Sequence, residues 1–308
     1  IKYIPIEIYG LSTSLKYMGR NIKNVFLIEK AYKKCIKLIK EFKPDVVIGV
    51  GGYVTYPVIK AAHKCGIKTF IHEQNSIPGK ANKGLLKYTD VVGVSFEDSI
   101  KYINHKNVVM TGNPVSESAR NIEVIPKTKY GLTKGKKAVL IFNGSLGSGA
   151  INEKMIEYLR DADKYNYEIL YITGKSFYEK FKENKFPKNV FIEPYVDNLS
   201  GLMKDFDLIV CRSGASSVAE ITSIRIPAIF IPSPYVANNH QFYNAESVVK
   251  EHAGFMIEES DLTKELLSET IDKVLNDKEL IDSVKKNLGK LEISNSATII
   301  YEEIKKML

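Results

Sequence analysis

The sequence predicts an α/β protein made of two doubly wound, Rossmann-like domains that face a cleft. Short runs rich in Val, Ile, Leu and Phe alternate with helical patterns of roughly 8–15 residues, as parallel strands joined by crossover helices require. Most of these runs are apolar without interruption, which is typical of parallel strands covered on both faces. In chain order, strands are expected at 45–50, 69–73, 91–95, 108–111, 138–143, 168–173, 190–193, 208–212, 228–232 and 254–258.

The chain is expected to divide near the stretch Gly-Asn-Pro-Val at 112–115. The residues from there to Lys136 are polar and show no clear period, and a new series of strands and helices then begins. The predicted parts are a first domain at 1–114, a second domain at 115–289, and a C-terminal helical part at about 290–308 that packs back on the first domain. An amphipathic helix is expected at 297–308 within that part, after a polar break at 294–296.

Composition and charge narrow the class of protein. The formal net charge of +8 over 308 residues indicates an anionic partner, which could be a nucleic acid, a nucleotide or a lipid surface. No apolar run approaches the ~20 residues of a membrane span, and the first twenty residues lack the apolar core of a signal peptide. The three cysteines lack metal-site spacing, and an odd number of them is typical of a reducing cytoplasm.

Neither a metal nor a cofactor is expected. Asp161 with Asp163, and Asp205 with Asp207, form Asp-x-Asp pairs, but both pairs precede strands and therefore fall on the amino edge of a sheet. They are interpreted as solvated turns. The five histidines show no spacing typical of metal ligands.

Several predicted strands run into small or polar residues at their carboxyl ends. Gly51 and Gly52 follow the first strand, and the second ends in Ile-His-Glu-Gln-Asn at 71–75. The stretches Asn-Gly-Ser-Leu-Gly-Ser-Gly at 143–149 and Arg-Ser-Gly-Ala-Ser-Ser at 212–217 follow two strands of the second domain. Ligands of open α/β sheets lie beyond this edge. Free N–H groups at helix N-termini there favour an anion such as phosphate.

Each of these features also has a purely structural interpretation. The two adjacent glycines could form only a tight turn, and 213–217 could be an ordinary helix N-cap. Glu220, one to two turns inside the next helix, could hold a ribose hydroxyl or be a surface charge. The loop at 143–149 lacks Gly-Lys-Ser/Thr, which disfavours an ATPase. Several such loops on the same edges favour a phosphate-containing ligand.

Six motifs occur together in the order of a known family: GGYVTYPV, HEQNSIPGKANK, GNPV, NGSLGSGAIN, CRSGASSVAEI and ANNHQFYNA. From about Ile4 to Leu308, the chain resembles the MurG family of bacterial N-acetylglucosaminyltransferases. These enzymes convert lipid I to lipid II in peptidoglycan synthesis, and so serve cell wall biogenesis, cell shape and cell division. The resemblance implies the GT-B glycosyltransferase fold, in which the second domain holds most of UDP-GlcNAc.

The resemblance also implies roles for particular residues. The backbone of Val196 would read uracil, Glu220 would hold the ribose, and 215–218 would lie against the diphosphate. Asn75 and Gln241 would contact the GlcNAc hydroxyls. The implied substrate-binding residues are Asn75, Ser145, Val196, Ala215, Ser216, Ser217, Val218, Glu220 and Gln241, with His72, Gly144, Gly214 and His240 as weaker candidates.

The implied mechanism is an inverting displacement at the anomeric carbon of the donor. The nucleophile is the C4 hydroxyl of the muramoyl sugar on a polyprenyl-diphosphate-linked pentapeptide acceptor. Backbone donors and a helix dipole, rather than a metal, would stabilise the departing UDP.

The sequence departs from the family pattern at three places. Asn143 replaces a glycine, and Ser116 replaces an arginine after Gly-Asn-Pro-Val. The family's first strand and glycine-rich, histidine-containing loop do not precede Ile1, so about 30 residues or more, the size of one βαβ unit, are expected to be absent. The catalytic residue is therefore unknown. Two alternatives remain: a catalytically incomplete UDP-sugar-binding module, and another UDP-sugar enzyme of the GT-B fold, which HEQN disfavours.

The lipid-linked acceptor implies a peripheral protein at the cytoplasmic face of the cell membrane, with an anionic membrane surface and not nucleic acid as the partner. The segment 9–24 is predicted to be the contact. Its apolar residues could enter the headgroup region while its cations meet anionic lipid. The apolar residues are Leu11, Leu15, Tyr17 and Met18, and the cations are Lys16, Arg20 and Lys23. Alternatively, the apolar residues pack beneath the helix expected at 25–42.

Overall fold

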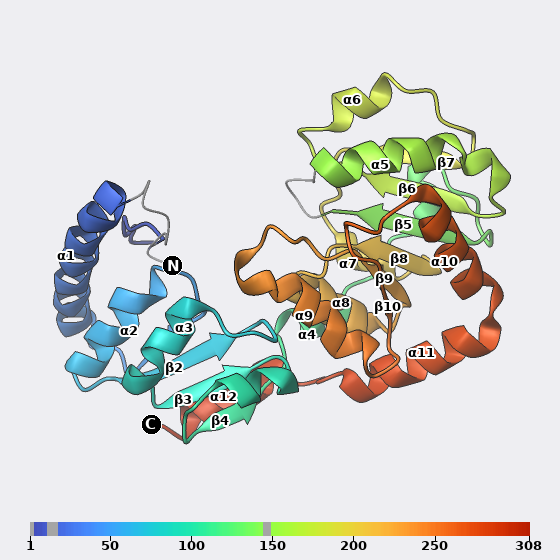
Figure 1. Ribbon diagram of the computed structural model, residues 1–308. Coiled ribbons are helices and arrows are strands. Elements are labelled where there is room, and N and C mark those ends of the chain that lie inside the picture. Colours follow the sequence, from blue (N-terminus) through green and yellow to red (C-terminus); the bar gives the residue numbers. More distant parts are fainter. Residues whose placement is uncertain (1–2, 11–17, 144–148) are drawn as a thin grey trace. The chain divides into compact units, whose positions relative to one another are not determined.

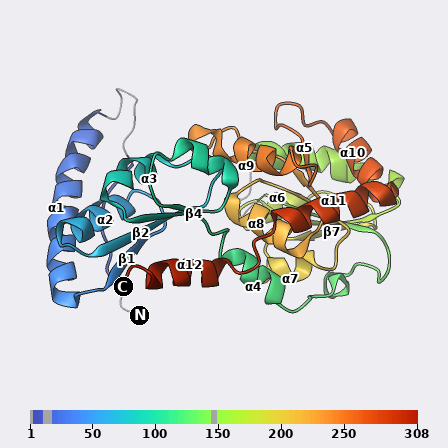
Figure 2. The same cartoon turned by 90° about the horizontal axis from the view of Figure 1, so that it is seen from below.

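The computed structural model describes residues 3–10, 18–143 and 149–308. The chain forms two compact units, each with its own parallel sheet (Figures 1 and 2). Unit 1 consists of Ile1–Asn113 and Asn295–Leu308, and unit 2 consists of Pro114–Ser294. The chain therefore crosses between the units twice, after Asn113 and after Ser294.

Unit 1 contains a four-stranded sheet in the order β1-β2-β3-β4, in which all neighbours are parallel. The strands are β1 Val46–Gly49, β2 Lys68–Glu73, β3 Val91–Val94 and β4 Val108–Met110. The α-helices are α1 Met18–Phe42, α2 Thr55–Lys64, α3 Lys80–Leu85 and α12 Ser296–Lys305. Apolar side chains of the strands pack with Ile59 of α2 and Leu85 of α3 to form the core.

Helix α1 packs on α2 along one side only. Cys35 and Ile39 of α1 are buried with Ala61 and Ala62 of α2 in a small apolar cluster. The small alanine side chains let the two helices approach closely. The first turns of α1 carry exposed apolar side chains instead, a point that bears on the membrane prediction.

Unit 2 contains a six-stranded parallel sheet in the order β10-β9-β8-β5-β6-β7. The strands are β5 Ala138–Phe142, β6 Glu168–Ile172, β7 Val190–Glu193, β8 Leu208–Cys211, β9 Ala228–Phe230 and β10 Phe255–Met256. The α-helices are α4 Val115–Asn121, α5 Gly149–Arg160, α6 Tyr178–Lys182, α7 Leu199–Met203, α8 Ala215–Ile224, α9 His240–Val249, α10 Lys264–Asn276 and α11 Lys278–Leu291. The side chains of β5, β6 and β8 are buried throughout, as continuous apolar runs predict.

The predicted fold class and all ten strands are confirmed, with differences at the ends. The strand expected at 254–258 is reduced to the two residues of β10, because only Phe255 and Met256 pair with β9. The amphipathic helix expected at 297–308 corresponds to α12 Ser296–Lys305, and the polar break before it is confirmed. Helix α11 ends at Leu291, and α12 starts at Ser296 after an irregular stretch.

Candidate functional site

The N-terminus of α8 lies directly beyond the carboxyl end of β8. Gly214 is the N-cap residue in an extended conformation and makes no side-chain capping bond. The first backbone bond of the helix runs from Val218 N to Gly214 O, at 3.0 Å. The N–H groups of the residues before Val218 therefore precede the helical ladder, where an anion is stabilised by these donors and by the helix dipole. The side chains at 215–217 are small, which leaves this backbone accessible.

A pocket of about 550 Å³ lies in unit 2 beside the carboxyl ends of its strands. Its volume falls within the range of small-molecule sites, roughly 300–1,000 Å³. Residues from β5, β6, α7 and α8, from the loop after β7 and from the C-cap of α4 line it, among them Ile122, Phe142, Ile172, Val196, Ser217 and Glu220. Three residues expected in the donor site, from two distant parts of the sequence, thus lie in the wall of one pocket. Gly144 and Ser145 lie outside the described residues.

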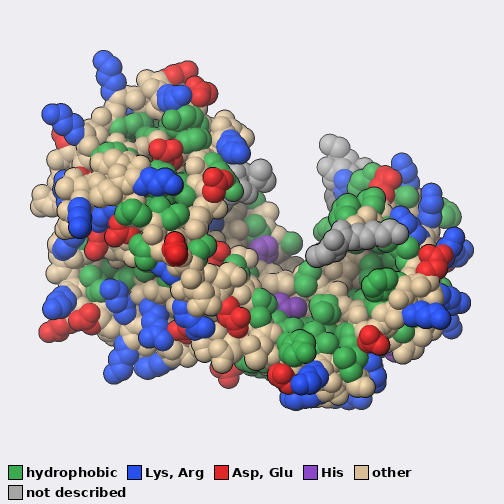
Figure 3. Space-filling model, turned by 180° about the vertical axis from the view of Figure 1, so that it is seen from behind, with side chains coloured by type: hydrophobic (Ala, Val, Ile, Leu, Met, Phe, Trp, Pro, Cys, Tyr) green, Lys and Arg blue, Asp and Glu red, His purple; other side chains and the backbone are tan. Residues whose placement is uncertain are grey.

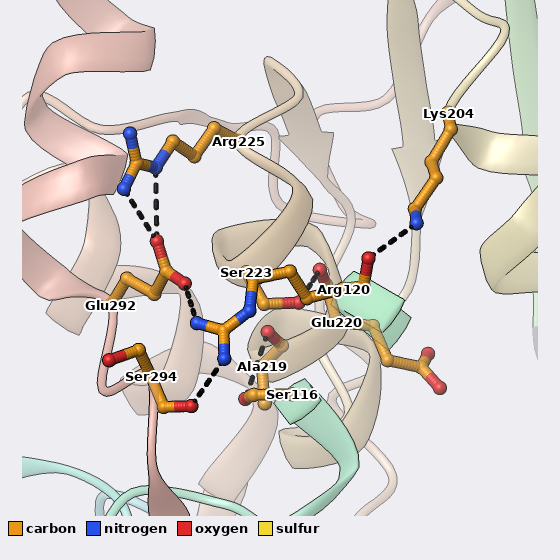
Figure 4. A network of polar contacts seen from close by, with 9 residues as sticks. All are labelled: Ser116, Arg120, Lys204, Ala219, Glu220, Ser223, Arg225, Glu292 and Ser294. Atoms are coloured by element: carbon orange, nitrogen blue, oxygen red, sulfur yellow. Dashed lines mark hydrogen bonds and ion pairs between the residues drawn. The ribbon is translucent and has the colours of Figure 1, made fainter. Parts of the chain in front are cut away.

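Glu220 is a partly buried carboxylate in the wall of this pocket and not a surface charge. Burial raises the pKa of its carboxyl group, because loss of water disfavours the charged form, and a hydrogen bond with Ser200 opposes that shift. In Figure 4 the carboxylate of Glu220 points away from the neighbouring ion pair of Arg120 and Glu292. A hydroxyl donor that enters the pocket would stabilise the charged form.

Helix α9 is tied to the loop after β8 by polar contacts. Ser213 Oγ donates to Gln241 O at 2.8 Å, and Asn244 Nδ2 donates to Ser213 O at 3.1 Å. The side-chain oxygen of Gln241 accepts from Ser233 N at 2.9 Å, which fixes the orientation of the amide. The ring of His240 contacts Ala237 O at 2.9 Å in the turn before the helix. These bonds therefore fix the position of Gln241 relative to the N-terminus of α8.

A buried ion pair behind this loop was not foreseen from the sequence. Arg212 Nη2 donates to Glu259 Oε2 at 2.5 Å, and Arg212 Nη1 donates to Ile231 O at 3.0 Å. Both charged residues are 8% exposed. The guanidinium thus joins the segments that follow β8, β9 and β10. The only sequence signal is an arginine placed at the end of an apolar strand.

In unit 1, His72 is a buried structural residue. Its Nε2 lies 2.9 Å from Gly112 O, and its Nδ1 lies 3.1 Å from Gln74 Nε2. Because a carbonyl only accepts, Nε2 carries the proton and Nδ1 accepts from the amide, which is the neutral tautomer. Burial lowers the pKa of His72, although Gly112 O and the charge of Glu73 oppose the shift. Both ring nitrogens of His72 therefore have protein partners.

Asn75 is oriented by the buried carboxylate of Glu73. Glu73 Oε1 accepts from Asn75 N at 3.0 Å and from Asn75 Nδ2 at 3.2 Å. Glu73 Oε2 accepts from Gly79 N and from Asn82 Nδ2 at 2.9 and 2.8 Å. The glutamate of the HEQN motif therefore stabilises the loop after β2 through these hydrogen bonds. Asn75 belongs to unit 1, whereas the other described candidates except His72 belong to unit 2.

Of the Asp-x-Asp carboxylates, Asp163 and Asp207 are exposed and Asp161 and Asp205 are partly buried, and three of the four also have protein partners. Asp205 Oδ2 accepts from Lys127 N at 2.7 Å, and Asp207 Oδ2 accepts from Ala138 N at 2.8 Å. Asp161 pairs with Lys264 at 2.9 Å. These carboxylates meet backbone N–H groups and a cation that sequence spacing did not reveal. Among the described residues, no group of three or more His, Cys, Asp or Glu is arranged to hold a metal ion.

Matches to two family domains identify the chain as a two-domain glycosyltransferase. Residues 1–94 match the glycosyltransferase family 28 N-terminal domain, and residues 138–299 match the glycosyltransferase family 28 C-terminal domain. The two matches fall in units 1 and 2, with the second reaching the start of α12.

Relatives of known name are similar over nearly the whole chain. A Bacillus licheniformis protein named UDP-N-acetylglucosamine--N-acetylmuramyl-(pentapeptide) pyrophosphoryl-undecaprenol N-acetylglucosamine transferase is 40% identical over 313 aligned positions, which cover 100% of this chain and 85% of that protein. A Bacillus thuringiensis protein of the same name, numbered 2, is 42% identical over 293 positions, which cover 94% and 80%. The chain therefore belongs to glycosyltransferase family 28 and, within it, to the MurG family.

Solved structures agree with this assignment. The crystal structure of Acinetobacter baumannii MurG matches with a TM-score of 0.74 and 27% identity, over 91% of this chain and 80% of that one. A structure of S. aureus MnaA with UDP matches with a TM-score of 0.71 over the same shares, at 17% identity. The second likeness concerns the fold alone.

Proposed function

We propose that this chain transfers N-acetylglucosamine from UDP-GlcNAc to the C4 hydroxyl of the muramoyl sugar of lipid I, which gives lipid II. The observation that carries the proposal is the pocket that joins Val196, Ser217 and Glu220 beside the α8 N-terminus, in a chain 40% identical to a transferase named for this donor and acceptor. The proposal assigns the acceptor to unit 1 and most of the donor to unit 2.

The chemistry follows from the donor end of the pocket. The acceptor oxygen forms a bond to the anomeric carbon and gives up its hydroxyl proton to a base or to water, the bond from that carbon to the diphosphate oxygen breaks, and the configuration inverts. Negative charge then grows on the diphosphate, which the N–H groups at 215–217 are proposed to stabilise. Glu220 is proposed to hold the ribose hydroxyls, Val196 the uracil, and Gln241 and Asn75 the GlcNAc hydroxyls.

Replacement of Glu220 by Ala is expected to weaken UDP-GlcNAc binding by about 1–3 kcal/mol, because a charged hydrogen bond to the ribose is lost. Calorimetry on the purified protein measures this change. Glu269→Ala, which removes an exposed carboxylate of α10 in the same unit, should leave the affinity unchanged. A 2′,3′-dideoxy donor should bind wild type and Glu220→Ala alike. Equal affinity of both proteins for UDP-GlcNAc would remove Glu220 from the site.

A membrane surface is proposed at the start of α1. Ile22, Val25 and Phe26 are 58%, 59% and 72% exposed and share one helix face at i, i+3 and i+4. Arg20 and Lys23 are also exposed. Ile22 belongs to the predicted segment 9–24, whose residues 11–17 lie outside the described part, and Val25 and Phe26 follow that segment on the same helix face. Apolar burial and cation attraction together favour binding to an anionic leaflet.

Two further observations bear on this proposal. No helix of the described residues is long and apolar enough to cross a membrane. On the face shown in Figure 3, Lys and Arg side chains are spread over both units rather than gathered in one stripe. The net charge therefore does not locate the contact, and the exposed apolar side chains of α1 are what supports the proposal. The proposed location is the cytoplasmic face of the membrane.

Replacement of Lys16, Arg20 and Lys23 together by Gln is expected to reduce co-sedimentation with anionic liposomes, since each cation near the leaflet is worth about 1 kcal/mol. Binding of the parent should weaken with salt and should require anionic lipid. The matched control replaces three exposed lysines of α11, at positions 278, 285 and 286, by Gln. If both triple variants sediment like the parent, the start of α1 is not the membrane surface.

A further inference from the structure

The residues of unit 2 that adjoin the two crossings, which are called the roots of the crossings, contact each other. Helix α4, Val115–Asn121, is the first element after the crossing at Asn113, and Ser294 is the last residue before the second crossing. Arg120 of α4 donates from Nη2 to Ser294 O at 2.7 Å. One side chain thus links the two roots, which are 174 residues apart in sequence (Figure 4).

Glu292 completes this link with both of its oxygens. Oε1 accepts from Arg120 Nη1 at 2.8 Å, and Oε2 accepts from Arg225 Nε and Nη2 at 3.0 and 2.8 Å. The Glu292 side chain is only 5% exposed, whereas the side chains of Arg120 and Arg225 are 36% and 56% exposed, so the pair has a buried carboxylate that two partly solvated arginines satisfy. Arg225 is the C-cap residue of α8, with φ of 54°. Glu292 therefore holds α4, α8 and the second crossing together.

The same cluster reaches the wall of the donor pocket. Ser116 Oγ donates to Ala219 O at 3.3 Å, next to Glu220. Lys204 Nζ donates to Arg120 O at 2.7 Å and to Ile122 O at 2.6 Å, and Ile122 lines the pocket. A cation at the carbonyl end of α4 also stabilises that helix. The end of α4 is thus bonded both to the crossings and to the donor pocket.

We infer that Glu292 is a positioning residue for the transfer reaction: through Arg120 and Arg225 it makes the donor pocket and the roots of both crossings one rigid body. The catalytic consequence of this inference rests on the proposed function. Transfer needs the acceptor on unit 1 to meet the donor on unit 2 in one geometry. Looser roots would misplace the acceptor oxygen while leaving the donor contacts within unit 2 intact.

Hydrogen exchange of the full chain tests the rigid body without any assay of activity. Glu292→Gln should speed amide exchange at both 115–122 and 292–295, and so should Arg120→Gln. The control is Asp161→Asn, which breaks an ion pair of 2.9 Å with Lys264 elsewhere in unit 2 and should leave both segments unchanged. Exchange that changes only in the segment carrying the substitution would overturn the inference.

Steady-state transfer and calorimetry test the consequence. Glu292→Gln should lower kcat about tenfold with a Kd for UDP-GlcNAc within about twofold of wild type. Arg120→Gln should do the same, and the double variant should be no worse than either single one, since both act on one network. A loss of donor affinity equal to the loss of kcat would overturn the positioning role. Failure of the wild type to bind UDP-GlcNAc would instead refute the proposed function. Hydrogen exchange would still test whether the two roots form one rigid body.

Discussion

Replacement of Arg212 by Met is expected to lower the free energy of unfolding by about 3–5 kcal/mol, because it leaves the Glu259 carboxylate buried without its partner. Glu259 is 8% exposed and 2.5 Å from Arg212 Nη2. The substitution also removes the donor to Ile231 O, a contact between the segments after β8 and β9. Urea unfolding of the purified protein measures the loss.

The companion variant carries Arg212→Met and Glu259→Leu together. It should recover much of the lost stability, because an apolar pair of similar volume replaces the buried charges. Both variants should bind UDP-GlcNAc more weakly than wild type does, because Arg212 directly precedes the loop at Ser213 that positions the α8 N-terminus. A double variant as unstable as Arg212→Met alone would show that the arginine acts through packing and not through its charge.

The strands could be predicted from the sequence because buried parallel strands leave a simple signature. Residues 138–142 and 208–211 are apolar without interruption, and both become strands buried on each face. The ends of elements could not be fixed in the same way. Ile257, expected within a strand, still donates from its N–H to Phe230 O, but β10 itself ends at Met256. Local composition does not reveal where the ladder of a neighbouring strand stops.

Part of the candidate site was also predictable, for a topological reason. The carboxyl ends of parallel strands meet at one edge, so Val196 and Glu220 could be expected near each other. The supporting contacts were not predictable, because each joins residues far apart in sequence: Arg212 and Glu259 are 47 apart, and His72 and Gly112 are 40 apart. His72 occurs in a motif suggestive of ligand binding, and only the fold reveals that both of its ring nitrogens have protein partners.

Replacement of His72 by Ala is expected to destabilise the protein by about 2–4 kcal/mol, because it opens a cavity and removes buried hydrogen bonds. His72 is 4% exposed and lies within 3.1 Å of polar atoms of Thr111, Gly112 and Gln74. Gln74 Nε2 also donates to Val50 O, so the ring connects the carboxyl ends of β1, β2 and β4. His72→Gln, which keeps a donor for Gly112 O, should cost less than His72→Ala.

The pH dependence of stability separates the neutral His72 from a merely space-filling ring. Burial lowers the pKa of His72 in the folded protein, whereas the unfolded chain takes up a proton near the ordinary value of about 6.5. As the pH falls below that value, the unfolded state binds the proton first, so the contribution of His72 to stability is complete above it and declines below it. Between about pH 7.5 and about pH 5.5, wild type should lose up to about 1.4 kcal/mol more unfolding free energy than His72→Gln. Urea titrations at both pH values measure this difference. The same loss in both proteins would mean that His72 is protonated in the folded state, and the bond from Nε2 to Gly112 O would then no longer identify the neutral tautomer.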